Sequence, residues 1–261
     1  MRSLSIAATG MLAQQLNVEV ISNNISNINT TGYKRQRAEF QDLLYQDLLR
    51  PGTTTSDAGT IVPSGIQVGL GVKPAAVYRI TEQGNLTITD NDLDLAINGR
   101  GYFAVDLPSG DTGYTRAGAL GRSPDGDLVT ADGYVVQPGI TIPNDATSIT
   151  INAQGEVLVG IDGQLTPSNV GQIQLANFPN EAGLRALGGN IFLETPGSGN
   201  ATLATPGSPG FGTIQQGALE TSNVNLVAEI TNLITAQRAY EMNSRVIQAS
   251  DEMMSSVVQL R

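Results

Sequence analysis

The side chains that most often perform catalysis or bind metals are missing from this sequence. Its 261 residues include no histidine and no cysteine, which excludes thiol catalysis, Ser-His-Asp triads, the usual zinc ligand sets and disulfides. Paired carboxylates, as used in glycoside hydrolysis, are the one catalytic arrangement that remains. The chain has no tryptophan and only 5% aromatic residues to stack on sugars. We therefore expect no catalytic residue, no cofactor and no metal.

Two short motifs imitate ligand sites without completing them. Asp90 to Asp94 has the opening spacing of a calcium loop, but Leu95 stands where the tight turn needs glycine and Gly101 where a bidentate glutamate is needed. Residues 99–104 imitate a dinucleotide fingerprint, but strand-like residues follow instead of the helix that would bind the pyrophosphate. We interpret the first motif as a solvated turn and the second as turn or close-packing positions.

The charge balance argues against nucleic acid and membrane partners. The chain carries 14 Lys and Arg against 24 Asp and Glu, and charged residues are only 15% of it, whereas both kinds of partner need clustered cations. Its one basic cluster, residues 34–37, is interpreted as a solvated helix end or a salt-bridging patch. Because the chain lacks both a long apolar run and a recognisable signal peptide, we expect no membrane insertion and either a cytoplasmic location or export without a cleaved signal.

The placement of proline and glycine indicates where helices can form. All 12 prolines lie between Pro51 and Pro209, no glycine occurs between Gly32 and Gly52, and none follows Gly217. Because proline breaks helices and glycine weakens them, both ends of the chain can be helical and the middle cannot.

An N-terminal helix is predicted up to residues 30–32. Its apolar seam has the 3.5-residue spacing of a coiled coil. The seam positions are Leu4, Ala7, Met11, Gln14, Val18, Ile21, Ile25 and Ile28. A C-terminal helix is predicted from Asn225 to Leu260, with a wider apolar stripe. The stripe includes Leu226, Val227, Ile230, Leu233, Ile234, Tyr240, Ile247, Met254 and Val258. Both helices are rich in amides, so we expect them to be marginal alone and to order on assembly.

The middle of the chain is predicted to be β structure. Short alternating runs at residues 86–89, 102–105, 128–130, 149–151 and 156–159 are separated by Asp-Gly turn pairs. Residues 50–71 and 195–212 are irregular and are interpreted as linkers, the first equally as an extended arm. The predicted fold is α+β, with long terminal helices pairing as a coiled-coil domain (1–34 and 218–261), an extended connecting segment with an insert (35–72), and a central, mainly antiparallel β domain (73–217).

Several motifs together resemble the bacterial flagellar rod and hook family over essentially the whole chain. The resemblance is carried by residues 21–34 (ISNNISNINTTGYK), 97–103 (INGRGYF), 114–118 (YTRAG), 220–226 (ETSNVNL) and 236–244 (AQRAYEMNS). Residues 40–46, 50–52 and 63–69 are similar to a segment found in the distal rod members of that family. The chain is also shorter than a typical hook protein, which usually has a further outer domain.

The resemblance implies a structural protein and not an enzyme. It implies export by the flagellar type III apparatus, polymerisation into a rigid hollow helical tube across the periplasm, and transmission of torque from rotor to hook while later subunits pass through the bore. The implied partners are other copies of the chain, proximal rod proteins, the hook protein, and the surrounding periplasmic and outer-membrane rings. Alternatives are a proximal rod or hook-type subunit, a secreted β-rich polysaccharide-cleaving enzyme, and an adhesin or passive surface protein.

The resemblance also suggests roles for particular residues. The assembly interface on the N-terminal helix would comprise Leu4, Ala7, Met11, Val18, Ile21, Asn24, Ile25 and Ile28. On the C-terminal helix it would comprise Leu226, Ile230, Leu233, Tyr240, Ile247, Met254 and Val258. A stiffening segment would contain Tyr45, Arg50, Pro51, Pro63 and Gly65. Phe40 and Leu44 fit a short pattern recognised by the export gate, and a role in helix packing is the alternative for both.

Overall fold

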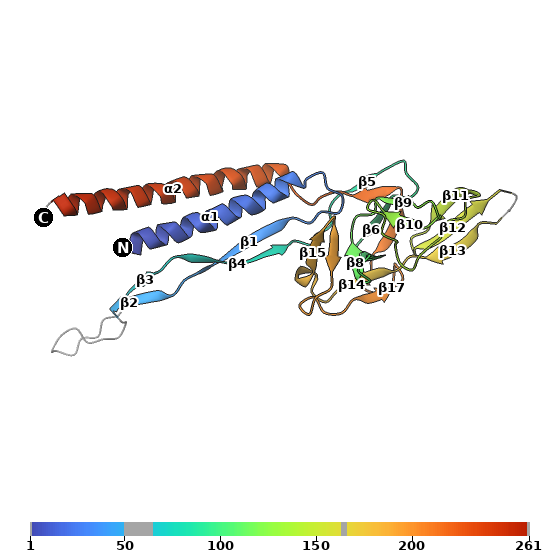
Figure 1. Cartoon of the computed structure of the whole chain (residues 1–261), viewed down its shortest axis with the longest axis horizontal. Coiled ribbons are helices and arrows are strands. Elements are labelled where there is room, and N and C mark those ends of the chain that lie inside the picture. The colour runs from blue at the N-terminus through green and yellow to red at the C-terminus, as the bar shows by residue number, and fades with distance from the viewer. Residues whose placement is uncertain (1, 50–64, 163–165, 260–261) are drawn as a thin grey trace. The chain divides into compact units, whose positions relative to one another are not determined.

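The computed structural model of the chain describes residues 2–49, 65–162 and 166–259. These residues form two long helices, α1 (Arg2–Ser26) and α2 (Leu226–Gln259), with strands and the short 3-10 helix η1 (Glu181–Gly183) between them (Figure 1). The chain divides into two compact units. The first contains Met1–Ile25, Gln36–Tyr78 and Leu226–Arg261, and the second contains Ser26–Arg35 and Arg79–Asn225. The predicted α+β class, with terminal helices and a central β region, is confirmed.

The two helices of the first unit lie side by side and antiparallel (Figure 1). Asn24, near the end of α1, bonds to Glu229 in the first turn of α2, and Ser3, near the start of α1, contacts Ser250 near the end of α2. Helix α1 ends at Ser26, two residues before the last predicted seam position. The reason is local: the Thr30 N–H and hydroxyl both bond to Asn27, which closes a turn in place of another helical turn.

A β-ribbon accompanies the helices in the first unit. Strand β1 (Gln36–Asp42) pairs with β4 (Val72–Arg79), and β2 (Tyr45–Leu49) pairs antiparallel with β3 (Ile66–Gly69). The Val72 N–H donates to the Thr9 hydroxyl of α1 across 3.4 Å. Residues 35–72, expected to be an extended connection, thus form paired strands over most of their described length.

The second unit is built from antiparallel β-sheets. Its six-stranded sheet has the order β15 (Arg185–Gly188), β16 (Ile191–Leu193), β8 (Thr112–Thr115), β7 (Tyr102–Asp106), β14 (Leu175–Asn177) and β17 (Thr202–Ala204). A three-stranded sheet contains β11 (Ala146–Ile151), β12 (Glu156–Ile161) and β13 (Ser168–Gln172). Two-stranded pairs join β9 (Leu120–Arg122) to β10 (Leu128–Thr130), β6 (Leu95–Asn98) to β18 (Thr213–Gln216), and β5 (Leu86–Ile88) to β19 (Ala218–Glu220).

The core of the second unit explains why these short strands hold together. Strand β12 buries alternate residues, as a strand with one covered face does, whereas β6, β7 and β14 bury consecutive residues and are therefore covered on both faces. The main cluster includes Leu95, Ile97, Phe103, Val105, Val157, Val159 and Leu175. The linker interpretation of residues 195–212 is wrong, because strand β17 lies within them and pairs with β14.

Candidate assembly interface

In the structure, the calcium-like motif forms a turn that its own side chains stabilise. Asp90 and Asp92 are exposed, but Asp94 is buried and its carboxylate accepts hydrogen bonds from the Thr89 hydroxyl (2.7 Å) and the Asn91 amide (2.9 Å). The solvated-turn interpretation is therefore wrong for Asp94, which closes the turn from inside. Among the residues that the structure describes, no group of three or more acidic side chains is arranged to hold a metal ion.

The dinucleotide-like motif is a close-packed turn, as one of the two sequence interpretations proposed. Gly99 and Gly101 have φ of 111° and 142°, a backbone region that favours glycine. A Cβ on Gly99 would lie 2.9 Å from the Gly212 Cα, and one on Gly101 would lie 3.2 Å from the Leu175 side chain. Gly99 thus allows a close approach of the Gly212 backbone, and Gly101 allows the Leu175 side chain to pack against it.

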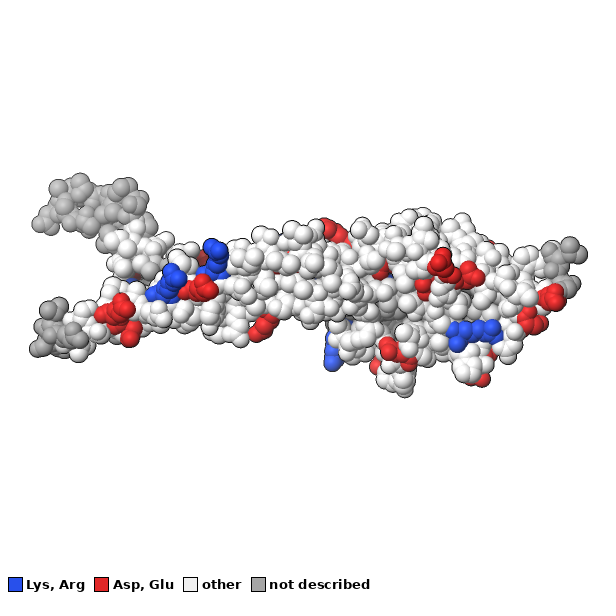
Figure 2. Space-filling model, turned by 90° about the horizontal axis from the view of Figure 1, so that it is seen from above, with Lys and Arg blue, Asp and Glu red and all other residues white. Residues whose placement is uncertain are grey.

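Charged side chains are few and scattered on the face shown in Figure 2. Most of that face is uncharged, in keeping with a charged fraction of 15%. A protein that stays monomeric usually keeps a more charged surface. A candidate interaction surface on this protein is therefore largely uncharged, and the exposed apolar side chains show where it lies.

The predicted interface positions of α1 are mostly covered within the subunit. Ala7, Ile21 and Asn24 are buried. The half-buried positions are Leu4, Met11, Val18, Ile25 and Ile28, of which Ile28 lies beyond the end of the helix. This apolar seam is already packed within its own subunit. It offers little free surface to a second copy.

Asn24 joins three elements of the first unit. It is 1% exposed. Its amide Nδ2 donates to the Gln36 carbonyl (2.8 Å) and to Glu229 Oε2 (3.2 Å), and its Oδ1 accepts from the Gln36 N–H (2.9 Å). These bonds fix the end of α1 to the start of both β1 and α2. The structure thus places Asn24 in a contact within the subunit.

The predicted interface positions of α2 are much more exposed. Leu226, Ile230, Tyr240 and Val258 are exposed, whereas Leu233, Ile247 and Met254 are half-buried. The interface set assigned from sequence omitted further exposed apolar side chains on the same helix, namely Val227, Ile234, Met242, Val246 and Met253. The width of the apolar stripe was the signal for them. Exposed apolar side chains in this number indicate an interaction surface.

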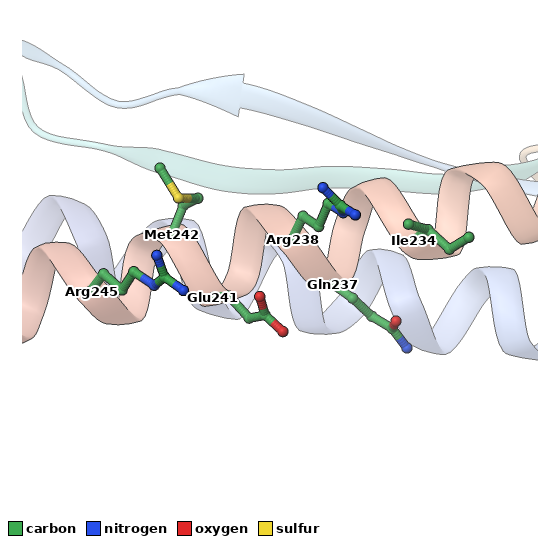
Figure 3. Close-up of a pocket in the computed structure, with 6 residues that line it drawn as sticks. All are labelled: Ile234, Gln237, Arg238, Glu241, Met242 and Arg245. Carbon is green, nitrogen blue, oxygen red and sulfur yellow. The ribbon is translucent and has the colours of Figure 1, made fainter.

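A hollow of about 500 Å³ lies on this helix (Figure 3). All the residues that line it belong to α2: Ile234, Gln237, Arg238, Glu241, Met242 and Arg245. Arg238 and Met242 point to one side of the helix and Gln237 and Glu241 to the other (Figure 3). The hollow combines apolar side chains with charges of both signs, a composition suited to contact with another protein surface.

The β-ribbon carries a second group of exposed apolar side chains. Leu44 is 82% exposed and Tyr45 is 58% exposed, and Leu48 and Ile66 are exposed on the paired strands. Such exposure is incompatible with the helix-packing alternative for Leu44 within the subunit. Phe40 is half-buried in β1 and Gly65 is half-buried just before β3. Arg50, Pro51 and Pro63 lie outside the described residues.

A buried ionic cluster in the second unit joins three of the sequence motifs. Glu220 is 1% exposed, and its carboxylate accepts from Lys34 Nζ (2.6 Å), Arg116 Nε (2.6 Å) and the Gly84 N–H (2.8 Å). Lys34 also donates to the Glu82 carbonyl. The guanidinium of Arg116 donates further to the carbonyls of residues 97, 99 and 101. The solvated interpretation of the basic cluster is wrong for Lys34, and the salt-bridging one is right.

The cluster sets the charge states of its members. Burial alone raises the pKa of the Glu220 carboxyl, but the charges and hydrogen bonds of Arg116 and Lys34 lower it more, so the pKa lies below its ordinary value. Burial and the charge of Arg116 together lower the pKa of the Lys34 ammonium. Glu220 therefore remains a carboxylate that compensates two buried cations.

Asn223 binds the strand connections beside this cluster. Its Oδ1 accepts from the Arg35 N–H (2.7 Å), and its Nδ2 donates to the carbonyls of Ile80 and Glu82 (2.9 Å each). Three segments distant in sequence are thereby joined within the second unit. The sequence motifs include Asn223, Arg116 and Glu220 but assign them no role. Glu220 and Asn223 bond to residues more than 100 positions away, and the ion pair of Arg116 with Glu220 spans 104 positions.

Comparison with known proteins places the whole chain among flagellar proteins. Three family models match it: "Flagella basal body rod protein" at residues 4–34, "Flagellar hook protein FlgE/F/G D1 domain" at 96–159, and "Flagellar basal body rod FlgEFG protein C-terminal" at 215–260. The chain is similar to the flagellar basal-body rod protein FlgG of Caulobacter vibrioides, with 63% identity over 100% of both chains. It is 54% identical to the FlgG protein of Agrobacterium fabrum over 98% of each chain. It is 38% identical to that of Bacillus subtilis over 100% of this chain and 99% of the relative.

Over the residues described, neither α1 nor α2 contains a window apolar enough to span a bilayer.

Proposed function

The chain belongs to the flagellar basal-body rod protein family, and on that premise we propose that it is a structural subunit of the distal rod of the bacterial flagellum. It polymerises into a rigid hollow helical drive shaft that crosses the periplasm, transmits torque from rotor to hook and conducts exported subunits. The full-length identity to rod proteins supports the family role. The exposed apolar face of α2 is the structural observation that carries polymerisation.

The terminal helices form the inner, coiled-coil part of the tube in this proposal. Helix α1 is covered largely by its own subunit, so α2 supplies most of the free apolar surface of the pair. Exposed side chains such as Val227, which is 75% exposed, would each gain a favourable burial term of about 1.5–3 kcal/mol when a second copy covers them. Stacking of identical subunits thus buries the exposed surface of each one, as in a helical polymer.

The β-ribbon around Tyr45 to Gly69 stiffens the tube in this proposal. The support is geometric: β2 and β3 pair antiparallel, Tyr45 with Gly69 and Asp47 with Gln67, and they present apolar side chains to the outside. A paired ribbon resists bending better than a single extended strand. Contact of the ribbon with neighbouring subunits would lock the lattice straight.

Export and partners follow from the same role. The proposed route is the flagellar type III apparatus, without a cleaved signal peptide, and Phe40 and Leu44 are the proposed recognition residues. The exposure of Leu44 supports this assignment because the side chain is not needed for packing in the subunit. The proposed neighbours are proximal rod proteins, the hook protein, and the periplasmic and outer-membrane rings. A proximal rod or hook-type subunit is the alternative, and no observation favours the enzyme or adhesin alternatives.

The role is tested in cells that lack the chain. Their basal bodies should end in a shortened rod without a hook, and the wild-type chain should restore both. Ile230→Asp should fail to restore them because it places a charge on the exposed face of α2, whereas Asn232→Asp, on the same helix but at a polar position, should succeed. A complete rod and hook in the absence of the chain would contradict the proposal.

A further inference from the structure

We propose that the register of α1 against α2 is set by a seam of small and amide side chains that repeats every seven residues. This seam is distinct from the apolar seam predicted from sequence, and its members lie one residue away from it along α1. The inference concerns a single subunit, so it holds whether or not the chain polymerises as proposed above.

Three contacts define the seam. The Ser250 hydroxyl lies 3.3 Å from the Ser3 hydroxyl, and the Asn24 amide bonds to the Glu229 carboxylate at 3.2 Å. Between them, Gly10 faces Asn243 so closely that a Cβ at residue 10 would lie 2.9 Å from the Asn243 amide nitrogen. The two residue numbers of each pair add to 253. Two antiparallel helices in one fixed register produce a constant sum of this kind.

The seven-residue spacing predicts a fourth layer of the seam, in addition to the three layers that the contacts define. The α1 members at 3, 10 and 24 are multiples of seven apart, and so are the α2 members at 229, 243 and 250. The missing layer pairs Asn17 with Ala236. Ala236 is 2% exposed on a helix that is otherwise largely exposed, and Asn17 is half-buried. Both exposures fit this position in the seam.

The alternating layers are apolar and follow the same register. The same register would place Ile6 opposite Ile247, Ala13 opposite Tyr240, and Val20 opposite Leu233, whose residue numbers also add to 253. Ala13 and Val20 are buried, and Leu233 and Ile247 are half-buried. This is the alternation of two seam positions that an antiparallel heptad pair requires.

The polar seam discriminates between registers where the apolar layers cannot. A slip of seven residues would still bring one apolar layer against another. It would, however, bring Ala236 or Ser250 to Gly10 and would part the amide of Asn24 from the carboxylate of Glu229. Both groups are buried, so the slipped pair would leave polar groups without these partners. A single polar seam position is known to fix register in helix pairs for the same reason.

Cysteine pairs test the register directly, because the chain has no cysteine of its own. The S3C/S250C and N17C/A236C variants of the full chain are oxidised at low concentration, and the fast-migrating intramolecular species is followed on non-reducing gels. Matched controls S3C/N243C and N17C/N243C lie on the same seam but one heptad out of register, about 10.5 Å along the axis. In-register pairs should close at least about tenfold faster, because disulfides need Cα atoms within about 7 Å. Equal rates, or failure of both in-register pairs, would overturn the register.

A second set of variants asks whether the seam sets the register or only reports it. Gly10→Asn, added to S3C/S250C, should slow closure about tenfold by placing two amides in the space of one. Asn243→Gly, added to Gly10→Asn, should restore most of the rate, since one amide again faces a glycine. Leu12→Asn, at an exposed position of α1, is the control and should change closure less than about twofold. Unchanged closure in Gly10→Asn would overturn the proposal, whereas a polymerisation defect with normal closure would count only against the proposed function.

Discussion

Replacing Glu220 by glutamine should destabilise the second unit strongly. The substitution keeps the size of the side chain but removes the negative charge that faces Lys34 and Arg116 at 2.6 Å each. At least one cation would then face an amide N–H instead of a carboxylate oxygen. All three charged side chains are at most 5% exposed, so water cannot replace the lost partner.

The magnitude follows from the burial and the number of bonds. Removing one partner of a buried ion pair costs about 3–5 kcal/mol because it leaves an uncompensated charge. For a unit of this size, about 2–4 °C of Tm is lost per kcal/mol, which predicts a drop of about 6–20 °C. Arg100→Gln is the matched control. It removes a 3.0 Å pair with Glu181 in which Arg100 is 62% exposed, and it should cost at most about 1 kcal/mol.

The assay is thermal unfolding followed by circular dichroism across a range of pH. The pKa of Glu220 is lower in the folded than in the unfolded chain, so its contribution is present above the unfolded pKa and is lost as the pH falls through the folded pKa. The difference between wild type and Glu220→Gln should therefore be largest near neutral pH and should shrink below about pH 4. A Glu220→Gln protein within about 1 kcal/mol of wild type at pH 7 would show that the carboxylate is not needed to compensate the two buried cations.

One deletion and two further substitutions test other regions of the chain. Deleting residues 46–64 should yield curved or flexible polymers in electron micrographs, and straight rods from the deletion would count against the stiffening role of the ribbon. Asn24→Ala should destabilise the first unit by about 1–3 kcal/mol in chemical unfolding, because it removes three hydrogen bonds of a buried amide; a loss below about 0.5 kcal/mol would contradict its bridging role. Leu44→Ala should reduce export into the medium while changing stability by less than about 0.5 kcal/mol, and normal export would remove Leu44 from the recognition pattern.

Sequence patterns predicted the elements of this protein better than their contacts. The distribution of proline and glycine identified both terminal helices, since either residue in a helix interior has a large local cost. The end of α1 was displaced because Asn27 forms a turn with Thr30, a competition between side chain and backbone that periodicity does not register. Strand β17 was missed because residues 195–212 have the composition of a linker.

The contacts that matter most join residues far apart in the sequence. Lys34 and Glu220 are 186 residues apart and Asn24 and Glu229 are 205 apart, so no local pattern could pair them. The helix contacts at Ser3, Gly10 and Asn24 were hidden for a different reason. Small and amide side chains do not contribute to an apolar periodicity. The apolar pattern of the adjacent helix face was stronger, so the predicted seam lies one residue after these positions.

Electron microscopy of the concentrated, purified chain tests polymerisation into a rigid tube without other components. We expect straight, hollow tubes whose innermost density consists of the two terminal helices, with the β units outside them. Failure of the wild-type chain to form tubes at high concentration, or tubes with the helices on the outer surface, would contradict it.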